Sequence, residues 1–194
     1  MVKLIGLKKL KTAVFISGTG SNLKNLIKFS LIKKSPIKIS FILSNISSAK
    51  GLNFAKKYRI KKKIFEFKKQ SSDENKIIKY LKKNNIKLIC LAGFMKILSP
   101  NFIQKFEGII LNIHPSLLPK YKGLNTHEKV IRNKEKFSGC TVHFVNTKLD
   151  SGKIVLQKKI KVAKNETPKS LAKKVLRQEH ILYPKALVKV LSNL

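Results

Sequence analysis

The side chains best suited to chemistry are an amide and an imidazole two residues apart, Asn112 and His114. They follow the apolar run 108–111, which is typical of a buried strand, and residues i and i+2 of a strand point to the same face. A neutral N–H donor beside an imidazole can stabilise an oxyanion and carry a proton. Asp150, one of only two aspartates in the chain, lies in a predicted hairpin turn. Each of the three also has an ordinary structural interpretation: a satisfied histidine, a turn cap and a hairpin residue.

A second candidate site is the glycine turn SGTGSN at residues 17–22, which joins a predicted strand to a predicted helix. Backbone N–H groups at a helix start favour an anion. A dinucleotide-binding turn would have glycine at Leu23 and an acid near Ser44 and Asn45. We therefore favour a single phosphate over a dinucleotide, with a simple helix cap as the alternative. The residues expected to hold that phosphate are Gly20, Ser21 and Asn22.

Strand-like and helix-like segments alternate along the first half of the chain, which predicts a doubly wound, mostly parallel (Rossmann-like) α/β sheet with helices on both faces. The expected strands are 12–17, 37–45, 62–67, 86–94 and 108–113, and the expected helices are 23–34, 48–59 and 71–84. Residues 139–162 predict a C-terminal antiparallel strand pair. A long helix should start at Thr167 and Pro168 and be kinked or divided at Pro184. We expect a single domain, 1–194, with a short basic lead at 1–11.

The composition is strongly basic, with 43 Lys and Arg against 9 Asp and Glu, a formal net charge of +34. A nucleic-acid-binding protein is the alternative from a different functional class. Only three of the basic residues are arginines, and the lysines are spread along the whole chain, so we favour a general surface bias that also attracts small anions. The thiols of Cys90 and Cys140 lie in strand-like runs and should be structural. No membrane span or signal peptide is evident, which predicts a cytoplasmic protein.

Six segments resemble the phosphoribosylglycinamide formyltransferase family, the folate-dependent transformylases of purine synthesis. In chain order they read ISGTGSNL, LAGFMKILSP, LNIHPSLLPKYKG, TVHFV, LDSGKIVLQ and QEHILYP. The resemblance covers residues 12–190, and NIHPSLLPKYKG is highly specific for the fold of 10-formyltetrahydrofolate hydrolases and transferases. It implies transfer of a formyl group from 10-formyltetrahydrofolate to the amine of 5'-phosphoribosylglycinamide, by direct attack of the amine and without a metal.

The resemblance also implies roles for individual residues. The catalytic residues would be Asn112, His114 and Asp150. The nucleotide phosphate would be bound by Gly20, Ser21 and Asn22, and its ribose hydroxyls by Glu179, for which a solvated helix charge is the alternative. The folate would be bound by Met95, Lys96, Ile97, Leu98, Asn112, Asn146, Thr147, Lys148, Leu149 and Asp150. The expected partners are these small molecules, with no specific nucleic acid and no membrane, and the protein would be a monomer or homodimer.

Two features limit what the resemblance implies. Bacterial members often carry an arginine just before the third helix, whereas residues 67–76 contain none. Either Lys68 or Lys69 compensates, or that contact is absent. Methionyl-tRNA formyltransferases would need a C-terminal RNA-binding domain and formyltetrahydrofolate hydrolases an N-terminal regulatory domain, so the chain is expected to be too short for either.

His143 shares a strand face with Thr141 and is a candidate supporting residue. His127 lacks a zinc-protease pattern because position 131 is Ile.

Overall fold

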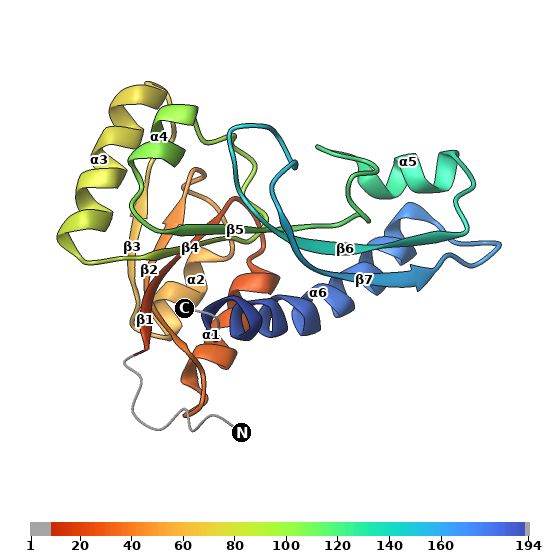
Figure 1. Cartoon of the computed structure of the whole chain (residues 1–194), viewed down its shortest axis with the longest axis horizontal. Coiled ribbons are helices and arrows are strands. Elements are labelled where there is room, and N and C mark those ends of the chain that lie inside the picture. The colour runs from red at the N-terminus through yellow and green to blue at the C-terminus, as the bar shows by residue number, and fades with distance from the viewer. Residues whose placement is uncertain (1–8, 193–194) are drawn as a thin grey trace. The chain divides into compact units, whose positions relative to one another are not determined.

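The computed structural model describes residues 9–192, so most of the expected basic lead, 1–8, lies outside the described residues. Seven strands follow the order β3-β2-β1-β4-β5-β6-β7. The chain divides into two compact units. The first ends at Ile110 and the second begins at Leu111. The elements are drawn in Figure 1.

The first unit contains four parallel strands. These are β1 (Leu10–Ile16), β2 (Ile37–Ser44), β3 (Lys61–Ile64) and β4 (Leu88–Leu91). All four residues of β4 are buried, as expected of a strand covered on both faces. By contrast, β3 is exposed along its length because it lies at the edge.

Four helices cover this parallel sheet. They are α1 (Ser21–Leu31), α2 (Leu52–Lys57), α3 (Gln70–Lys83) and α4 (Pro100–Lys105). The strand order reverses after β3, so right-handed crossovers place α1 and α2 on one face and α3 on the other, as Figure 1 shows. α3 begins at Gln70, with Lys69 rather than a serine at the N-cap, and it packs against α4. The aspartate expected in its first turn, Asp73, lies there.

The second unit is an antiparallel arrangement. It contains β5 (Ile109–His114) from Leu111 onward, β6 (Phe137–Phe144) and β7 (Ile154–Lys161), together with α5 (Thr126–Arg132) and α6 (Pro168–Leu191). The buried face of α6 packs against β6 and β7, with Leu171, Val175 and Leu187 fully buried. α6 begins with a capping box between Thr167 and Ser170, in agreement with the predicted cap.

The predicted fold class is confirmed, with three differences in its elements. The prediction that α6 could be divided at Pro184 is wrong, because α6 continues through this residue. Its flanking residues Tyr183, Ala186 and Leu187 are fully buried, and the packing on both sides of the proline holds the helix together. The hairpin strands are joined by a longer loop than expected, 145–153, and α4 and α5 were not predicted.

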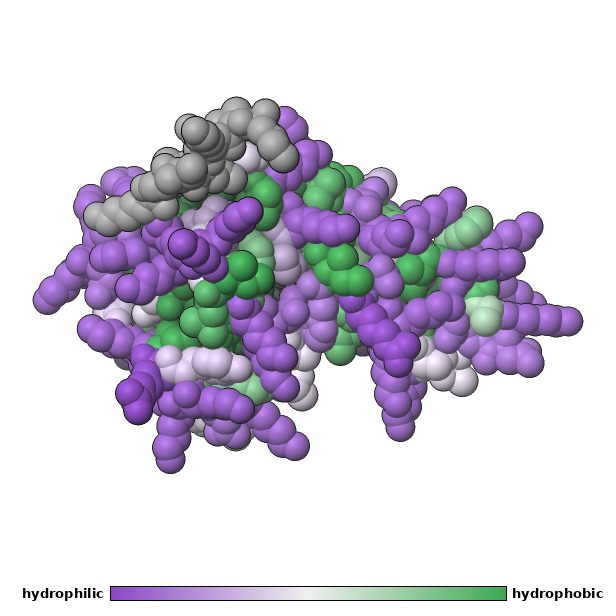
Figure 2. Space-filling view, turned by 90° about the horizontal axis from the view of Figure 1, so that it is seen from below, coloured by the Kyte–Doolittle hydropathy of each residue, from purple (hydrophilic) through white to green (hydrophobic). Residues whose placement is uncertain are grey.

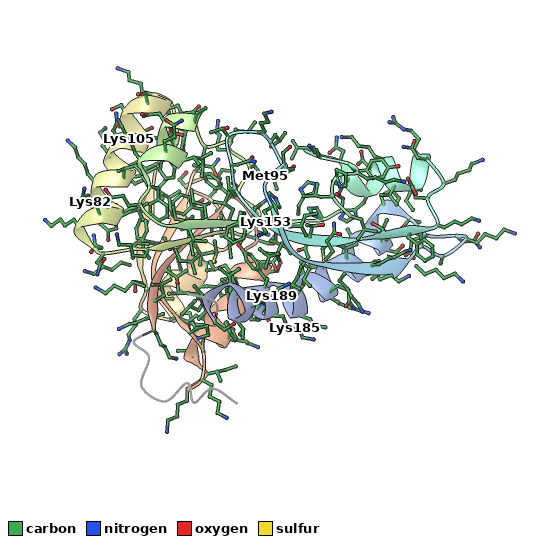
Figure 3. All side chains as sticks on the ribbon, in the orientation of Figure 1. Lys82, Met95, Lys105, Lys153, Lys185 and Lys189 are labelled. Atoms are coloured by element: carbon green, nitrogen blue, oxygen red, sulfur yellow. The ribbon has the colours of Figure 1, made fainter. Side chains whose placement is uncertain are left out.

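Long polar side chains dominate the surface. Figure 2 shows mostly hydrophilic residues on the face in view, with smaller hydrophobic patches between them. Lys82 of α3 and Lys105 of α4, labelled in Figure 3, belong to this layer of exposed lysines. The thiols of Cys90 and Cys140 are buried in β4 and β6. Within residues 9–192, no helix combines the length and the apolar character needed to cross a bilayer.

Candidate active site

The amide and the imidazole at the end of β5 project from the same face of the strand, as the sequence predicts. The neighbouring strand β6 is antiparallel, and its register places His143 opposite Asn112 and Thr141 opposite His114. The Asn112 Nδ2 atom is 3.2 Å from the Nε2 atom of His143. Two strands therefore bring an amide and two imidazoles onto one face.

Asp150, in the loop between β6 and β7, joins this group. Its Oδ2 atom lies 3.4 Å from His114 Nδ1 and accepts a hydrogen bond of 2.9 Å from the backbone N–H of Gly123. Its Oδ1 atom lies 3.5 Å from both Asn112 Nδ2 and His143 Nε2. The side chains of Asp150 and His114 are only 7% and 6% exposed. Asp150 therefore contacts both of the other predicted catalytic residues, Asn112 and His114.

Each of the two imidazoles is oriented by a backbone carbonyl. His114 Nε2 is 2.8 Å from the carbonyl oxygen of Tyr121, and His143 Nδ1 is 2.8 Å from that of Phe144. A carbonyl oxygen only accepts hydrogen bonds, so each of these nitrogens carries a hydrogen. In its neutral form, His143 therefore accepts the hydrogen bond from Asn112 at Nε2. A proton gained or lost by His114 must be on Nδ1, the nitrogen that faces Asp150.

The electrostatics favour a neutral imidazole beside an ionised carboxylate. Burial lowers the pKa of His114 below its usual value, although the hydrogen bond to Tyr121 and the Asp150 carboxylate oppose this shift. Burial by itself would raise the pKa of Asp150. The contact with His143, the Gly123 N–H and the attraction of both histidines outweigh burial, so the pKa of Asp150 is lowered. His114 is thus suited to accept a proton that Asp150 then stabilises.

The carbonyl that orients His114 is itself held in place. Tyr121 adopts a left-handed backbone conformation, with φ 57°, and its hydroxyl donates a 2.8 Å hydrogen bond to Glu135. Lys120 Nζ also contacts Glu135 at 2.8 Å, and Asn133 donates to the Tyr121 hydroxyl at 3.0 Å. This network fixes the turn after β5 from its outer side.

The inner side of the same turn is fixed by Thr141, which pairs with His114 across the strands. Its hydroxyl donates to the Ser116 carbonyl at 2.7 Å and accepts from the Leu118 N–H at 3.2 Å. Gln157 of β7 donates to the Thr141 hydroxyl and to the Leu118 carbonyl, both at 2.8 Å. A buried polar scaffold therefore sets the position of the turn behind His114.

The glycine turn in the first unit has the features of an anion site. Gly20 is the N-cap of α1 and has φ 74°, and a Cβ there would lie 2.6 Å from Gly51 Cα. Glycine is therefore required. Within the described chain, no side chain caps the start of α1, and its first turn contains no acid. The first N–H groups of a helix point out of its end, and the helix dipole there favours an anion.

The expected folate loop after β4 also lies in the first unit. Met95 and Ile97 are exposed at 61% and 66%, whereas Leu98 is buried. Met95, labelled in Figure 3, donates its backbone N–H to the Ser17 hydroxyl at 2.7 Å. The Ile97 carbonyl accepts a hydrogen bond of 3.0 Å from Gln70 of α3. The loop thus presents two apolar side chains from a backbone that is fixed at two points.

The remaining predicted residues lie in the second unit. Residues 146–149 are exposed and precede Asp150 in the loop between β6 and β7. Glu179 of α6 is only 6% exposed, so it is not the solvated helix charge that the sequence left as an alternative. His143 is in direct contact with the site, and its shared face with Thr141 was the signal that pointed to it. Gly123 and Tyr121 were not predicted, although both lie in the specific segment LPKYKG.

The sequence matches the family model described as "Formyl transferase" over residues 10–187. It is 43% identical to phosphoribosylglycinamide formyltransferase of Haemophilus influenzae over 177 residues, covering 90% of this chain and 84% of that protein. It is 40% identical to the human trifunctional purine biosynthetic protein adenosine-3 over 189 residues. That match covers 96% of this chain and 19% of the human protein, so the chain spans about a fifth of that relative.

Solved structures agree with these matches. The crystal structure of phosphoribosylglycinamide formyltransferase from Brucella melitensis has a TM-score of 0.89 and 40% identity, covering 94% of this chain and 96% of that one. The corresponding structure from Anaplasma phagocytophilum has a TM-score of 0.87 and 41% identity, covering 96% and 88%.

Proposed function

Because the chain belongs to the formyl transferase family, we propose that it transfers the formyl group of 10-formyltetrahydrofolate to the amine of 5'-phosphoribosylglycinamide in purine biosynthesis. The observation that carries this proposal is the meeting of Asn112, His114 and Asp150, each within 3.5 Å of another member of the group. An amide donor, a neutral imidazole and an ionised carboxylate are what formyl transfer to an amine requires.

Attack of the amine on the formyl carbon places negative charge on the formyl oxygen. Asn112 would stabilise this oxyanion by donating one of its two Nδ2 hydrogens. The other Nδ2 hydrogen would keep its hydrogen bond to His143 Nε2. The hydrogen directed at Asp150 is the available one, because its 3.5 Å distance makes a weak hydrogen bond. The contact with His143 keeps the amide oriented before the reaction begins, so little reorganisation is needed.

The attacking nitrogen must lose a proton, and the departing folate nitrogen must gain one. His114 would accept this proton at Nδ1, since its Nε2 hydrogen is held by the Tyr121 carbonyl. The resulting imidazolium would face Asp150 Oδ2, whose negative charge stabilises it. The same nitrogen can then release the proton to the leaving group.

Each of the two units would contribute residues that bind the substrates. In the first unit, the turn of Gly20, Ser21 and Asn22 would bind the phosphate, and the loop Met95, Lys96, Ile97 and Leu98 would bind the pterin, with the side chain of Leu98 supporting it from the core. In the second unit, Glu179 would bind the ribose hydroxyls. The loop Asn146, Thr147, Lys148 and Leu149 would contact the folate next to Asp150.

The wider setting follows from the proposed reaction. Both substrates are small molecules, and the protein would act in the cytoplasm as a monomer or homodimer. Its net charge of +34 would help to attract these anionic substrates and needs no specific nucleic acid. Among residues 9–192, no group of three His, Cys, Asp or Glu side chains is placed to hold a metal ion.

The test compares three formyl acceptors in the presence of 10-formyltetrahydrofolate: 5'-phosphoribosylglycinamide, methionyl-tRNA and water. We expect formylation of the ribonucleotide and no comparable reaction with the other two. Preferential reaction with methionyl-tRNA or water would instead support another formyltetrahydrofolate-using enzyme of this fold. Absence of transfer to the ribonucleotide, or transfer that His114→Ala leaves unchanged, would overturn the proposal.

A further inference from the structure

Ser17 is the first residue of the glycine turn, and the proposed function gives it no role. β1 ends at Ile16, and Ser17 follows directly as the first letter of SGTGSN. The residue is only 6% exposed. A buried hydroxyl is expected to have hydrogen-bond partners, and those partners show which parts of the first unit it connects.

The Ser17 hydroxyl joins two other loops of the first unit. Its Oγ atom accepts a 2.7 Å hydrogen bond from the Met95 N–H, in the loop after β4. Because that N–H can only donate, the single hydrogen of the hydroxyl is left for another partner. It is donated over 2.5 Å to Oδ1 of Asn45, which directly follows β2. One side chain therefore links the segments that follow three neighbouring strands, β2, β1 and β4.

The backbone of the turn contacts the same two loops. The Ser17 N–H donates to the Gly93 carbonyl at 3.0 Å. On the other side, the Gly51 N–H donates to the Gly18 carbonyl at 3.0 Å, and a Cβ on Gly51 would lie 3.0 Å from Gly20 Cα. The turn therefore cannot move without changing its contacts with both loops.

A serine that only stabilised the end of a strand would need no distant partner. Ser44, the last residue of β2, bonds to the N–H and the carbonyl of Ile46, two residues away. Such local hydrogen bonds are common for serine. The partners of Ser17 are 28 and 78 residues away along the chain. Its hydroxyl therefore fixes the position of one loop against another.

We propose that Ser17 is a positioning residue that links the phosphate turn to the pterin loop, so that an anion bound at the turn steadies the backbone of Met95. An anion that orders the turn also orders the serine, and the loop then loses less freedom when it binds its own ligand. This inference rests on the proposed function, which places a phosphate at the turn and a pterin at residues 95–98. Since such a link is reciprocal, a bound pterin would favour the phosphate in turn. In this role Ser17 acts through Met95 and takes no part in the transfer of the formyl group.

The experiment follows hydrogen exchange of the Met95 amide by NMR, with and without inorganic phosphate at an ionic strength kept constant with chloride. In the wild type, phosphate should slow this exchange by about 2- to 12-fold, the contribution of a single neutral hydrogen bond to an opening equilibrium. In Ser17→Ala the exchange should be faster and should no longer respond to phosphate. Ser17→Thr keeps the hydroxyl and should keep the response.

The matched control is Ser35→Ala, which removes another buried hydroxyl from the first unit. Ser35 is 4% exposed, and its hydroxyl bonds to Ile37 at the start of β2, at the amino end of the parallel strands. This variant loses a buried hydroxyl as Ser17→Ala does, but its Met95 amide should respond to phosphate as in the wild type. A purely structural effect of losing a buried serine would appear in both variants.

A second measurement tests the consequence for the folate. The Kd of 5,8-dideazafolate, which has no formyl group to transfer, is measured by calorimetry with and without phosphate. Phosphate should lower this Kd by about 2- to 12-fold in the wild type and leave it unchanged in Ser17→Ala.

Amide chemical shifts of Gly20 and Ser21 report phosphate binding separately. If these shifts respond to phosphate but exchange at Met95 does not, or if Ser17→Ala responds as the wild type does, the proposal is overturned. If they do not respond, the phosphate site of the proposed function is wrong, and this inference falls with it. The two failures are therefore distinguishable.

Discussion

Replacement of Asn112 by alanine tests the proposed role of the amide in stabilising the oxyanion. In the structure, Nδ2 is 3.2 Å from His143 Nε2 and 3.5 Å from Asp150 Oδ1. The side chain therefore makes a good hydrogen bond to His143 and a weak one to Asp150. We expect the Nδ2 hydrogen of the weak bond to be donated instead to the formyl oxygen as it becomes negative.

The size of the effect follows from that assignment. Loss of a positioned oxyanion donor typically costs about 2.7–4 kcal/mol of barrier, which corresponds to a ~100- to ~1,000-fold lower kcat. The KM values should change much less, because the charge develops only in the transition state. Loss of the hydrogen bond to His143 should lower the free energy of unfolding by about 1 kcal/mol.

The assay is steady-state formyl transfer at saturating concentrations of both substrates, with urea unfolding as the test of stability. Asn53→Ala, at an exposed position of α2, is the matched control and should retain full kcat. Asn112→Asp preserves the shape of the side chain but places a carboxylate 3.5 Å from Asp150, so its kcat should also fall steeply. A fall in kcat of less than about 10-fold for Asn112→Ala would refute the reasoning, since an oxyanion donor is worth ~100-fold or more.

Three further predictions follow from individual residues. Gly20→Ala should destabilise the protein by about 1–3 kcal/mol and raise the KM for the ribonucleotide, because φ is 74° and the added Cβ would lie 2.6 Å from Gly51 Cα; unchanged urea unfolding would contradict this. Asp150→Asn removes an attraction that raises the pKa of His114, so this pKa should fall further. The acid limb of the kcat/KM profile should then move to lower pH while kcat falls. A move of the acid limb to higher pH would contradict the predicted fall in the pKa of His114. Burial raises the pKa of Cys140 to about 12, so mass spectrometry should detect alkylation of this thiol by iodoacetamide only after unfolding.

The parallel half of the fold could be predicted because its elements are long enough to show their periodicity. Near-continuous apolar strands such as β4 and the amphipathic α3 carry a strong signal. α4 and α5 have only 6 and 7 residues, too few to show a helical period. The continuation of α6 through Pro184 depends on tertiary packing, which the local sequence does not reveal.

The site was predictable to the extent that it depends on one strand. The pairing of Asn112 with His114 follows from a period of two. The contact between Asn112 and His143 depends on the register of two strands, and alternation alone does not fix that register. The position of Asp150 depends on the backbone N–H of Gly123, a contact between two loops. Such a contact has no periodic signal, so the sequence placed Asp150 in the hairpin turn without predicting its contact with Gly123.

The lysines at the two ends of the sheet have a consequence for how the protein avoids self-association. The outermost strands are β3, with Lys61, Lys62 and Lys63, and β7, with Lys158, Lys159 and Lys161. An outermost strand has unpaired backbone groups that could extend the sheet into another molecule. A second copy would approach with the same rows of ammonium groups, and their repulsion opposes edge-to-edge aggregation. Part of the large positive charge can therefore serve solubility rather than recognition.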